Sequence, residues 1–159
     1  MALTKGLNSF VSLAEADAYF ADRLDVDAWT SALEAQKSQA LVTATTMLNY
    51  LDWAGVAVSE DQSLAFPRTG TYFDPKVGSQ VALQSVNPSL RLSTATFELA
   101  YHLLNNDGLL DDAGGVDTLK VGTIVLDNLS APKSLPDIVY RVIRPMLANL
   151  GSRSWWRAN

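Results

Sequence analysis

The 159-residue chain has no cysteine, a single histidine and only 18% charged residues. Without cysteine it can form neither disulfides nor thiolate metal sites, and nothing points to an oxidising compartment. No apolar run approaches the roughly 20 residues of a membrane-spanning helix, and the first residues lack the apolar core of a secretory signal. We therefore expect a protein with no membrane partner that is made in a cytoplasm.

The sequence patterns of common catalytic sites are missing as well. There is no Gly-rich phosphate loop followed by Lys and Ser or Thr, no G-x-S-x-G and no HExxH. His102 lies beside a predicted apolar stripe without an evident partner, so we interpret it as a packing residue. Asp22, Asp25 and Asp27 are spaced somewhat like calcium ligands, but the glycine and distal glutamate of an EF-hand loop are absent. We expect no enzyme, no metal and no cofactor.

Positive charge is also scarce, because 12 lysines and arginines face 17 acidic residues and the net charge is -5. Sequence-independent binding to nucleic acid depends on cations that displace counterions from phosphates. The overall charge therefore argues against broad attraction to DNA. A nucleic-acid site in this chain would need a local exception.

What the chain does have is 48% hydrophobic residues, enough for one buried core. Apolar periodicity predicts a mainly α fold: a small bundle of about four helices, with a long extended loop or short β element between the third and fourth. The expected helices run over Leu13 to Leu24, Ala32 to Leu51, Pro88 to Asn105 and Pro136 to Leu150. We divide the chain into a domain over 1–150, with its extended loop at 109–133, and a tail over 151–159.

Capping residues support the helix starts. Ser12 with Glu15, and Ser31 with Glu34, have the spacing of capping boxes. Asn87 is the expected cap of the third helix, with Pro88 at its first position. Ser134 is the expected cap of the fourth helix, where Pro145 should remove a backbone hydrogen bond and can bend the axis.

The segment from Leu64 to Gly70 holds one charged side chain, Arg68, on a turn. Pro67 fixes its own φ and favours an extended Phe66, while Gly70 permits a positive φ. One interpretation is an ordinary surface turn. The other is that the turn positions Arg68 for a contact, with its own helix, with a neighbouring subunit or with another protein.

About 28 residues separate the third and fourth predicted helices, far more than the roughly 4 to 6 residues of a usual connection. Within them, the stretch Leu119 to Leu126 is rich in β-branched residues and favours a strand. A single strand needs a partner. The candidates are a strand near Tyr72 to Leu83 of the same chain and an edge supplied by a neighbouring subunit.

The C-terminal end is locally basic and aromatic, with no acid after Asp137. Its cations and tryptophans are Arg141, Arg144, Arg153, Trp155, Trp156 and Arg157. Two adjacent tryptophans expose a large apolar surface unless something covers them. They can fold back onto the core, anchor a protein partner, or stack single-stranded bases between arginines.

The order of these features resembles a known family. The stretch from Asn8 to Phe20, Trp29, the helix end at Leu51 to Gly55 and the Arg68 turn are similar to small head-tail connector (adaptor) proteins of tailed bacteriophages, some members of which are labelled DnaT-like single-stranded DNA binding. The resemblance covers most of residues 8 to 150 and implies a structural subunit of the virion neck, assembled in the host cytoplasm. It would bind the portal protein, form a ring, expected to be a dodecamer, and support a stopper or tail protein. Genomic DNA would pass through an acidic lumen without specific binding.

Site residues follow from the same resemblance. In those connectors the extended loop lies against the adjacent protomer and the C-terminal segment projects toward the portal. The implied intersubunit residues are Arg68, Lys120, Val121, Thr123, Ile124, Val125 and Leu126. The implied portal-binding or partner-binding residues are Arg153, Trp155, Trp156 and Arg157. Two alternatives stay open: a single-stranded DNA binding module that uses those tail residues, and a small enzyme or regulator whose site the sequence does not reveal.

Overall fold

The computed structural model describes residues 2–106, 119–121, 124–126 and 135–148, and every structural statement below concerns those residues. Its helices are α1 (Leu13–Ala21), α2 (Asp27–Ser31), α3 (Glu34–Asn49), α4 (Val86–Asn105) and α5 (Asp137–Ile143), which continues into the 3-10 turn η1 (Arg144–Met146). The strands are β1 (Val56–Ala57), β2 (Arg68–Thr69), β3 (Thr71–Asp74), β4 (Ser79–Ala82), β5 (Leu119–Val121) and β6 (Ile124–Leu126).

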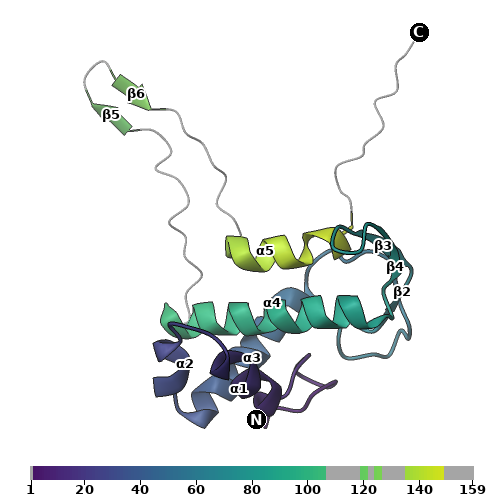
Figure 1. Ribbon diagram of the computed structural model, residues 1–159, viewed down its shortest axis with the longest axis horizontal. Coiled ribbons are helices and arrows are strands. Elements are labelled where there is room, and N and C mark those ends of the chain that lie inside the picture. Colours follow the sequence, from purple (N-terminus) through teal and green to yellow (C-terminus); the bar gives the residue numbers. More distant parts are fainter. Residues whose placement is uncertain (1, 107–118, 122–123, 127–134, 149–159) are drawn as a thin grey trace.

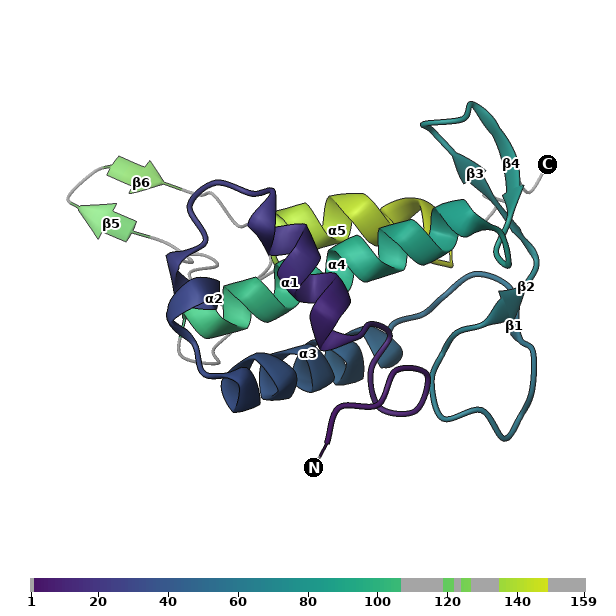
Figure 2. The same ribbon diagram turned by 60° about the horizontal axis from the view of Figure 1, so that its bottom comes forward.

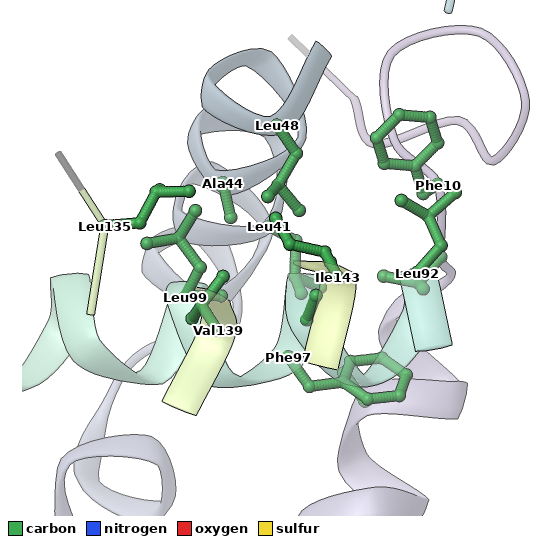
Figure 3. Packing of buried hydrophobic residues seen from close by; sticks show 14 of the residues in the cluster. Phe10, Leu41, Ala44, Leu48, Leu92, Phe97, Leu99, Leu135, Val139 and Ile143 are labelled. Atoms are coloured by element: carbon green, nitrogen blue, oxygen red, sulfur yellow. The ribbon is translucent and has the colours of Figure 1, made fainter. Parts of the chain in front are cut away.

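Helix α4 is the centre of the fold. It packs between α3 and α5, with α1 and α2 on the α3 side (Figures 1 and 2). Leu41 and Leu48 of α3 meet Leu99 of α4 and Ile143 of α5 in a core from which water is excluded (Figure 3). Burial of such side chains stabilises a fold by about 1.5–3 kcal/mol each, so this sandwich of helices forms the rigid base for the segments around it.

Local signals located the first helix start correctly. The backbone N–H of Ser12 donates to Glu15 Oε2 over 2.8 Å, and the Glu15 N–H donates to Ser12 Oγ over 3.3 Å, which is the predicted capping box. The helix ends at Ala21, three residues earlier than predicted. Asp25, just beyond it, has a positive φ of 56°, a conformation that no helix can include.

Two other predicted starts are displaced. Ser31 does not cap α3, because it is the last residue of the short helix α2, and the Leu33 N–H instead donates to the side chain of Gln36 over 2.9 Å. Helix α4 begins after Ser85, so Asn87 and Pro88 lie inside its first turn. Pro88 is still tolerated there, because the first N–H groups of a helix have no intrahelical acceptor.

Pro145 ends the last helix instead of bending it. Helix α5 stops at Ile143, and the chain passes through η1 to an extended Leu147. A proline cannot donate to the carbonyl one turn back, so the predicted helix to Leu150 is too long. The predicted cap Ser134 lies outside the described residues, and Pro136 occupies the cap position.

The predicted fold class, mainly α with about four helices, is wrong. The described part of the chain combines five helices with antiparallel two-stranded sheets, β1–β2, β3–β4 and β5–β6, and is a mixed α and β fold. These strands have two to four residues, too short for the alternating pattern on which strand prediction depends. The β-branched stretch from Leu119 to Leu126 pairs with itself, with Leu119 opposite Leu126, and not with β3 or β4, whereas a contact with a neighbouring subunit stays a prediction.

No helix in the described part of the chain has both the length and the apolar character that crossing a membrane requires.

Candidate functional site

A hollow lies between the β3–β4 hairpin and the segment formed by α5 and η1, and we call it the hairpin groove. It has a volume of about 580 Å³ and opens to solvent. Both walls approach each other at one end of α4 (Figure 1). The lining residues are Ala54, Thr71, Tyr72, Phe73, Pro75, Gln80, Arg141, Arg144, Pro145 and Leu147.

The hairpin wall presents an aromatic ring to solvent. Side chains alternate across β3, so that Tyr72 and Asp74 are buried while Phe73 stays 54% exposed. Gln80 of β4 lies directly opposite Phe73 in the register and is exposed on the same face. An exposed phenyl ring beside an amide is a surface that can stack a flat ligand and donate or accept hydrogen bonds at its edge.

The opposite wall presents two cations. Arg141 of α5 and Arg144 of η1 are both exposed, and no hydrogen bond or ion pair joins their guanidinium groups to other residues in the described ranges. Lys5, Arg23, Lys37 and Arg91, by contrast, each pair with a carboxylate. The groove thus holds two exposed guanidinium groups for which we find no carboxylate partner within the described ranges.

Charge is segregated along the molecule. Between Leu13 and Glu34 there are six carboxylates and one arginine. Helices α1 and α2 of this acidic stretch lie toward one end of α4, whereas the hairpin groove lies at the other end (Figures 1 and 2). The groove is therefore the local exception that a nucleic-acid site needs in a protein of net charge -5.

Below the groove a buried ion pair fixes the hairpin. Asp74 is fully buried and accepts from Tyr72 Oη over 2.7 Å, from the Lys76 backbone N–H over 2.9 Å and from Arg91 Nη2 over 2.5 Å. The Arg91 guanidinium, assisted by those other donors, holds the pKa of the Asp74 carboxyl well below its usual range even though burial opposes this. Burial and the adjacent carboxylate raise the pKa of Tyr72 to about 12.

Arg68 lies at the edge of this region and contacts its own chain. Its Nε donates to the Ala54 carbonyl over 2.8 Å and its Nη2 to the Gly55 carbonyl over 2.7 Å, with longer contacts to the carbonyls of Trp53 and Ala65. These bonds hold the 53–55 loop against β2. Of the roles left open for Arg68, the contacts favour support of its own loop, and a contact with another molecule stays a prediction.

None of the other predicted site residues is among the described residues that line the groove. Lys120, Val121, Ile124, Val125 and Leu126 form the β5–β6 pair, whereas Thr123 lies outside the described residues. The tail residues Arg153, Trp155, Trp156 and Arg157 lie outside them too. His102 is half-buried on α4 beside Asn106. In the described ranges, which contain Asp22, Asp25 and Asp27, we find no group of three or more side chains that could hold a metal ion.

Sequence reasoning missed Phe73 and Gln80. A weak signal was present, because Pro75 and Gly78 bracket a turn between two short stretches that contain the strand-favouring residues Tyr72, Phe73 and Val81. It did identify Arg141 and Arg144 as part of a basic end of the chain.

Comparison with known proteins gives a single informative result. A family model described as "Putative DnaT-like ssDNA binding protein" matches residues 2–158. No curated protein and no solved structure matches the chain significantly.

This match corrects the resemblance to head-tail connectors, because the family that covers almost the whole chain is not a connector family. The description as a portal-binding ring subunit in the neck of a bacteriophage virion is overturned with it. Its residues explain the error: a capping box and an arginine that holds a loop serve many unrelated folds. The chain belongs to the DnaT-like family that this model describes.

Proposed function

We propose that the protein binds single-stranded DNA in the hairpin groove. The observation that carries the proposal is the placement of two unpaired guanidinium groups, Arg141 and Arg144, across from the exposed ring of Phe73. The family match supports the same function. Of the three functions weighed from the sequence, single-stranded DNA binding is the one that the groove chemistry favours.

The groove combines the two contacts that recognise a single strand without reading its sequence. Arginines bind phosphate oxygens, and an aromatic side chain stacks a base with about 1–3 kcal/mol. A base can reach the face of Phe73 only when it is not stacked and paired inside a duplex. We therefore expect single strands to bind in preference to duplexes of the same length.

The test is a titration of a fluorescently labelled oligothymidine, read by anisotropy at low and moderate salt. We expect the wild type to bind and Phe73→Ala to weaken binding by about 1–3 kcal/mol, a factor of roughly 5 to 150. Arg141→Ala and Arg144→Ala should each weaken binding. Each should also make the dependence of log affinity on log salt shallower by the amount that one phosphate contact contributes.

Two matched controls separate the groove from the general surface. Tyr50→Ala removes an aromatic ring that is 84% exposed at the end of α3, and Lys5→Ala removes an exposed cation near the N-terminus. Neither should change the affinity by more than about twofold. Equal losses in the groove variants and the controls, or full binding after Phe73→Ala and Arg144→Ala, would contradict the proposal.

A second location for the same function is the tail. Arg153, Trp155, Trp156 and Arg157 have the residue types of a stacking platform. The tail would add contacts to those of the groove or would replace the groove as the binding site. Truncation of the chain after Ala148 separates these two possibilities.

A further inference from the structure

Arg91 touches both walls of the hairpin groove from beneath. Its Nη2 and Nε donate to the two carboxylate oxygens of Asp74, over 2.5 and 3.3 Å, and its Nη1 donates to the Val142 carbonyl over 3.1 Å. Asp74 is the residue after Phe73 on β3, and Val142 is the residue after Arg141 on α5. The Arg91 guanidinium on α4 thus binds the sequence neighbour of the Phe73 ring on one wall and the sequence neighbour of Arg141 on the other.

We propose that Arg91 is a positioning residue that sets the separation of the two groove walls, and so holds Phe73 and Arg141 where one strand can contact both. The assignment of this separation to DNA binding rests on the proposed function. The control of the separation rests only on the contacts of Arg91.

The chemistry of the side chain explains why an arginine stands here. A guanidinium has five N–H donors in a rigid plane, so it can bind a carboxylate with two of them and a carbonyl with a third. A lysine has one compact ammonium group on a flexible stem and cannot hold both partners in a fixed geometry. Arg91→Lys therefore keeps the charge that Asp74 needs but loosens the link between the walls.

Strand β3 and η1 also pack against each other, but each of the other hydrogen bonds that we find near the groove holds only one wall. The Ala54 N–H donates to the Met146 carbonyl over 2.9 Å and the Ala148 N–H donates to the Asp52 carbonyl over 2.7 Å, which tie the end of η1 to the 52–54 loop. The Leu83 N–H donates to the Gly70 carbonyl over 2.9 Å, within the base of the hairpin. Arg91 is the side chain among the described residues for which we find polar bonds to both walls at once.

The first measurement needs no DNA. Because the chain has no cysteine, Val77→Cys on the hairpin turn and Tyr140→Cys on α5 give two unique sites for spin labels. Both native side chains are about half-exposed and neither lines the groove. We expect a narrow distribution of label distances in this background and a broader or shifted one when Arg91→Lys is added.

The structure offers a matched control in a second arginine of the same kind. Arg23 donates to the buried carboxylate of Glu98, which also accepts from Tyr19 Oη over 2.6 Å, so Arg, carboxylate and Tyr repeat the Asp74 arrangement between α1 and α4. Arg23→Lys should lower the melting temperature comparably but leave the label distances unchanged. Asp74→Asn, which removes the charge and keeps the shape, should act like Arg91→Lys.

The second measurement is a double-mutant cycle in oligothymidine binding. Arg91→Lys should weaken binding at least about fivefold in the wild-type background and have no further effect when Phe73→Ala and Arg141→Ala are present. Arg23→Lys should not weaken binding in either background.

The outcomes are distinguishable. Unchanged label distances in Arg91→Lys, or an equal loss of affinity with and without Phe73 and Arg141, would overturn the inference. If the wild type binds no oligonucleotide but its label distances depend on Arg91, the proposed function fails and the control of the wall separation by Arg91 is supported.

Discussion

At the scale of single residues, Arg68 shows how a charged side chain can serve its own fold. Its guanidinium donates to the part-buried carbonyl of Ala54 at 2.8 Å and to the exposed carbonyl of Gly55 at 2.7 Å. We expect Arg68→Met to destabilise the protein by about 1–3 kcal/mol, because the part-buried carbonyls of Trp53 and Ala54 lose hydrogen bonds that water does not fully replace. Urea unfolding measures the change.

Lys76→Met provides the control for Arg68, since Lys76 is an exposed cation on the hairpin turn and its ammonium group forms none of the ion pairs that we find among the described residues. This variant should shift stability by less than about 0.5 kcal/mol. The sequence also allowed Arg68 to contact another molecule. An unchanged unfolding free energy in Arg68→Met, together with an altered mass by light scattering, would favour that alternative.

Two tyrosines make stability sensitive to high pH. Burial, followed by the hydrogen bonds to Asp74 and Glu98, raises the pKa of Tyr72 and of Tyr19 to about 12, against 10 for an ordinary tyrosine. Between these values the unfolded chain has released both protons and the folded chain still holds them, so stability is full below pH 10 and falls as pH rises to 12.

The slope of the unfolding free energy against pH is proportional to the number of protons by which the folded and unfolded chains differ. Tyr72→Phe and Tyr19→Phe should each lower that number by about one between pH 10 and 12, and the double variant should lower it by about two. The measurement is urea unfolding at intervals between pH 9 and pH 12. An unchanged slope in both single variants would show that other groups cause the loss of stability.

At the scale of elements, the β1–β2 pair depends on a close approach of two backbone segments. Gly55 has a positive φ of 72°, and a Cβ built there would lie 2.1 Å from the Thr69 carbonyl oxygen and 2.6 Å from Leu83 Cδ1. Gly78, at the hairpin turn, has an almost equal φ of 73° but nothing within 4 Å of its Cβ position. The two glycines therefore separate backbone strain from steric collision.

Gly78→Ala should cost about 1 kcal/mol from strain alone, whereas Gly55→Ala should cost more than about 3 kcal/mol, because β2 must move away as well. Thermal unfolding of both variants measures the difference. Equal costs would mean that the 55–69 contact adjusts freely.

The same scale shows which elements a sequence can predict. The capping box of α1 is encoded within four residues, from Ser12 to Glu15, and was located correctly. The equally regular spacing of Ser31 and Glu34 was misleading, because Trp29 is buried in the core and draws the preceding residues into α2. Tertiary packing decided the boundary there, and no local pattern records it.

The groove was less predictable than the helices, for a related reason. Arg141 and Arg144 were recognised as part of a basic segment, but nothing in the sequence places them opposite Phe73. That placement is made by Arg91 and Asp74, which lie 17 residues apart and join β3 to α4. Sites built from several elements need the long-range contacts that a local analysis does not contain.

At the scale of the whole molecule, DNA binding by an acidic protein should depend on few contacts. Arg141 and Arg144 offer two phosphate contacts in the groove, and the tail carries two more arginines, Arg153 and Arg157. For single strands, each contact steepens the dependence of log affinity on log salt by about 0.7. The salt slope therefore counts how many of these cations act.

A chain that ends at Ala148 keeps the described contacts of the C-terminal segment, including the bond from the Ala148 N–H to the Asp52 carbonyl. We expect it to fold with an unchanged circular dichroism spectrum, to bind oligothymidine more weakly and to have a salt slope shallower by about 1.4.

Trp155→Ala with Trp156→Ala in the full chain should weaken binding without a change of slope, because stacking releases no counterions. Truncation removes the tail arginines, and Arg141→Ala with Arg144→Ala removes those of the groove, so the effect of each set on affinity and on salt dependence is measured separately. If truncation abolishes binding and the groove variant binds as the wild type does, the tail is the DNA site and the groove is not.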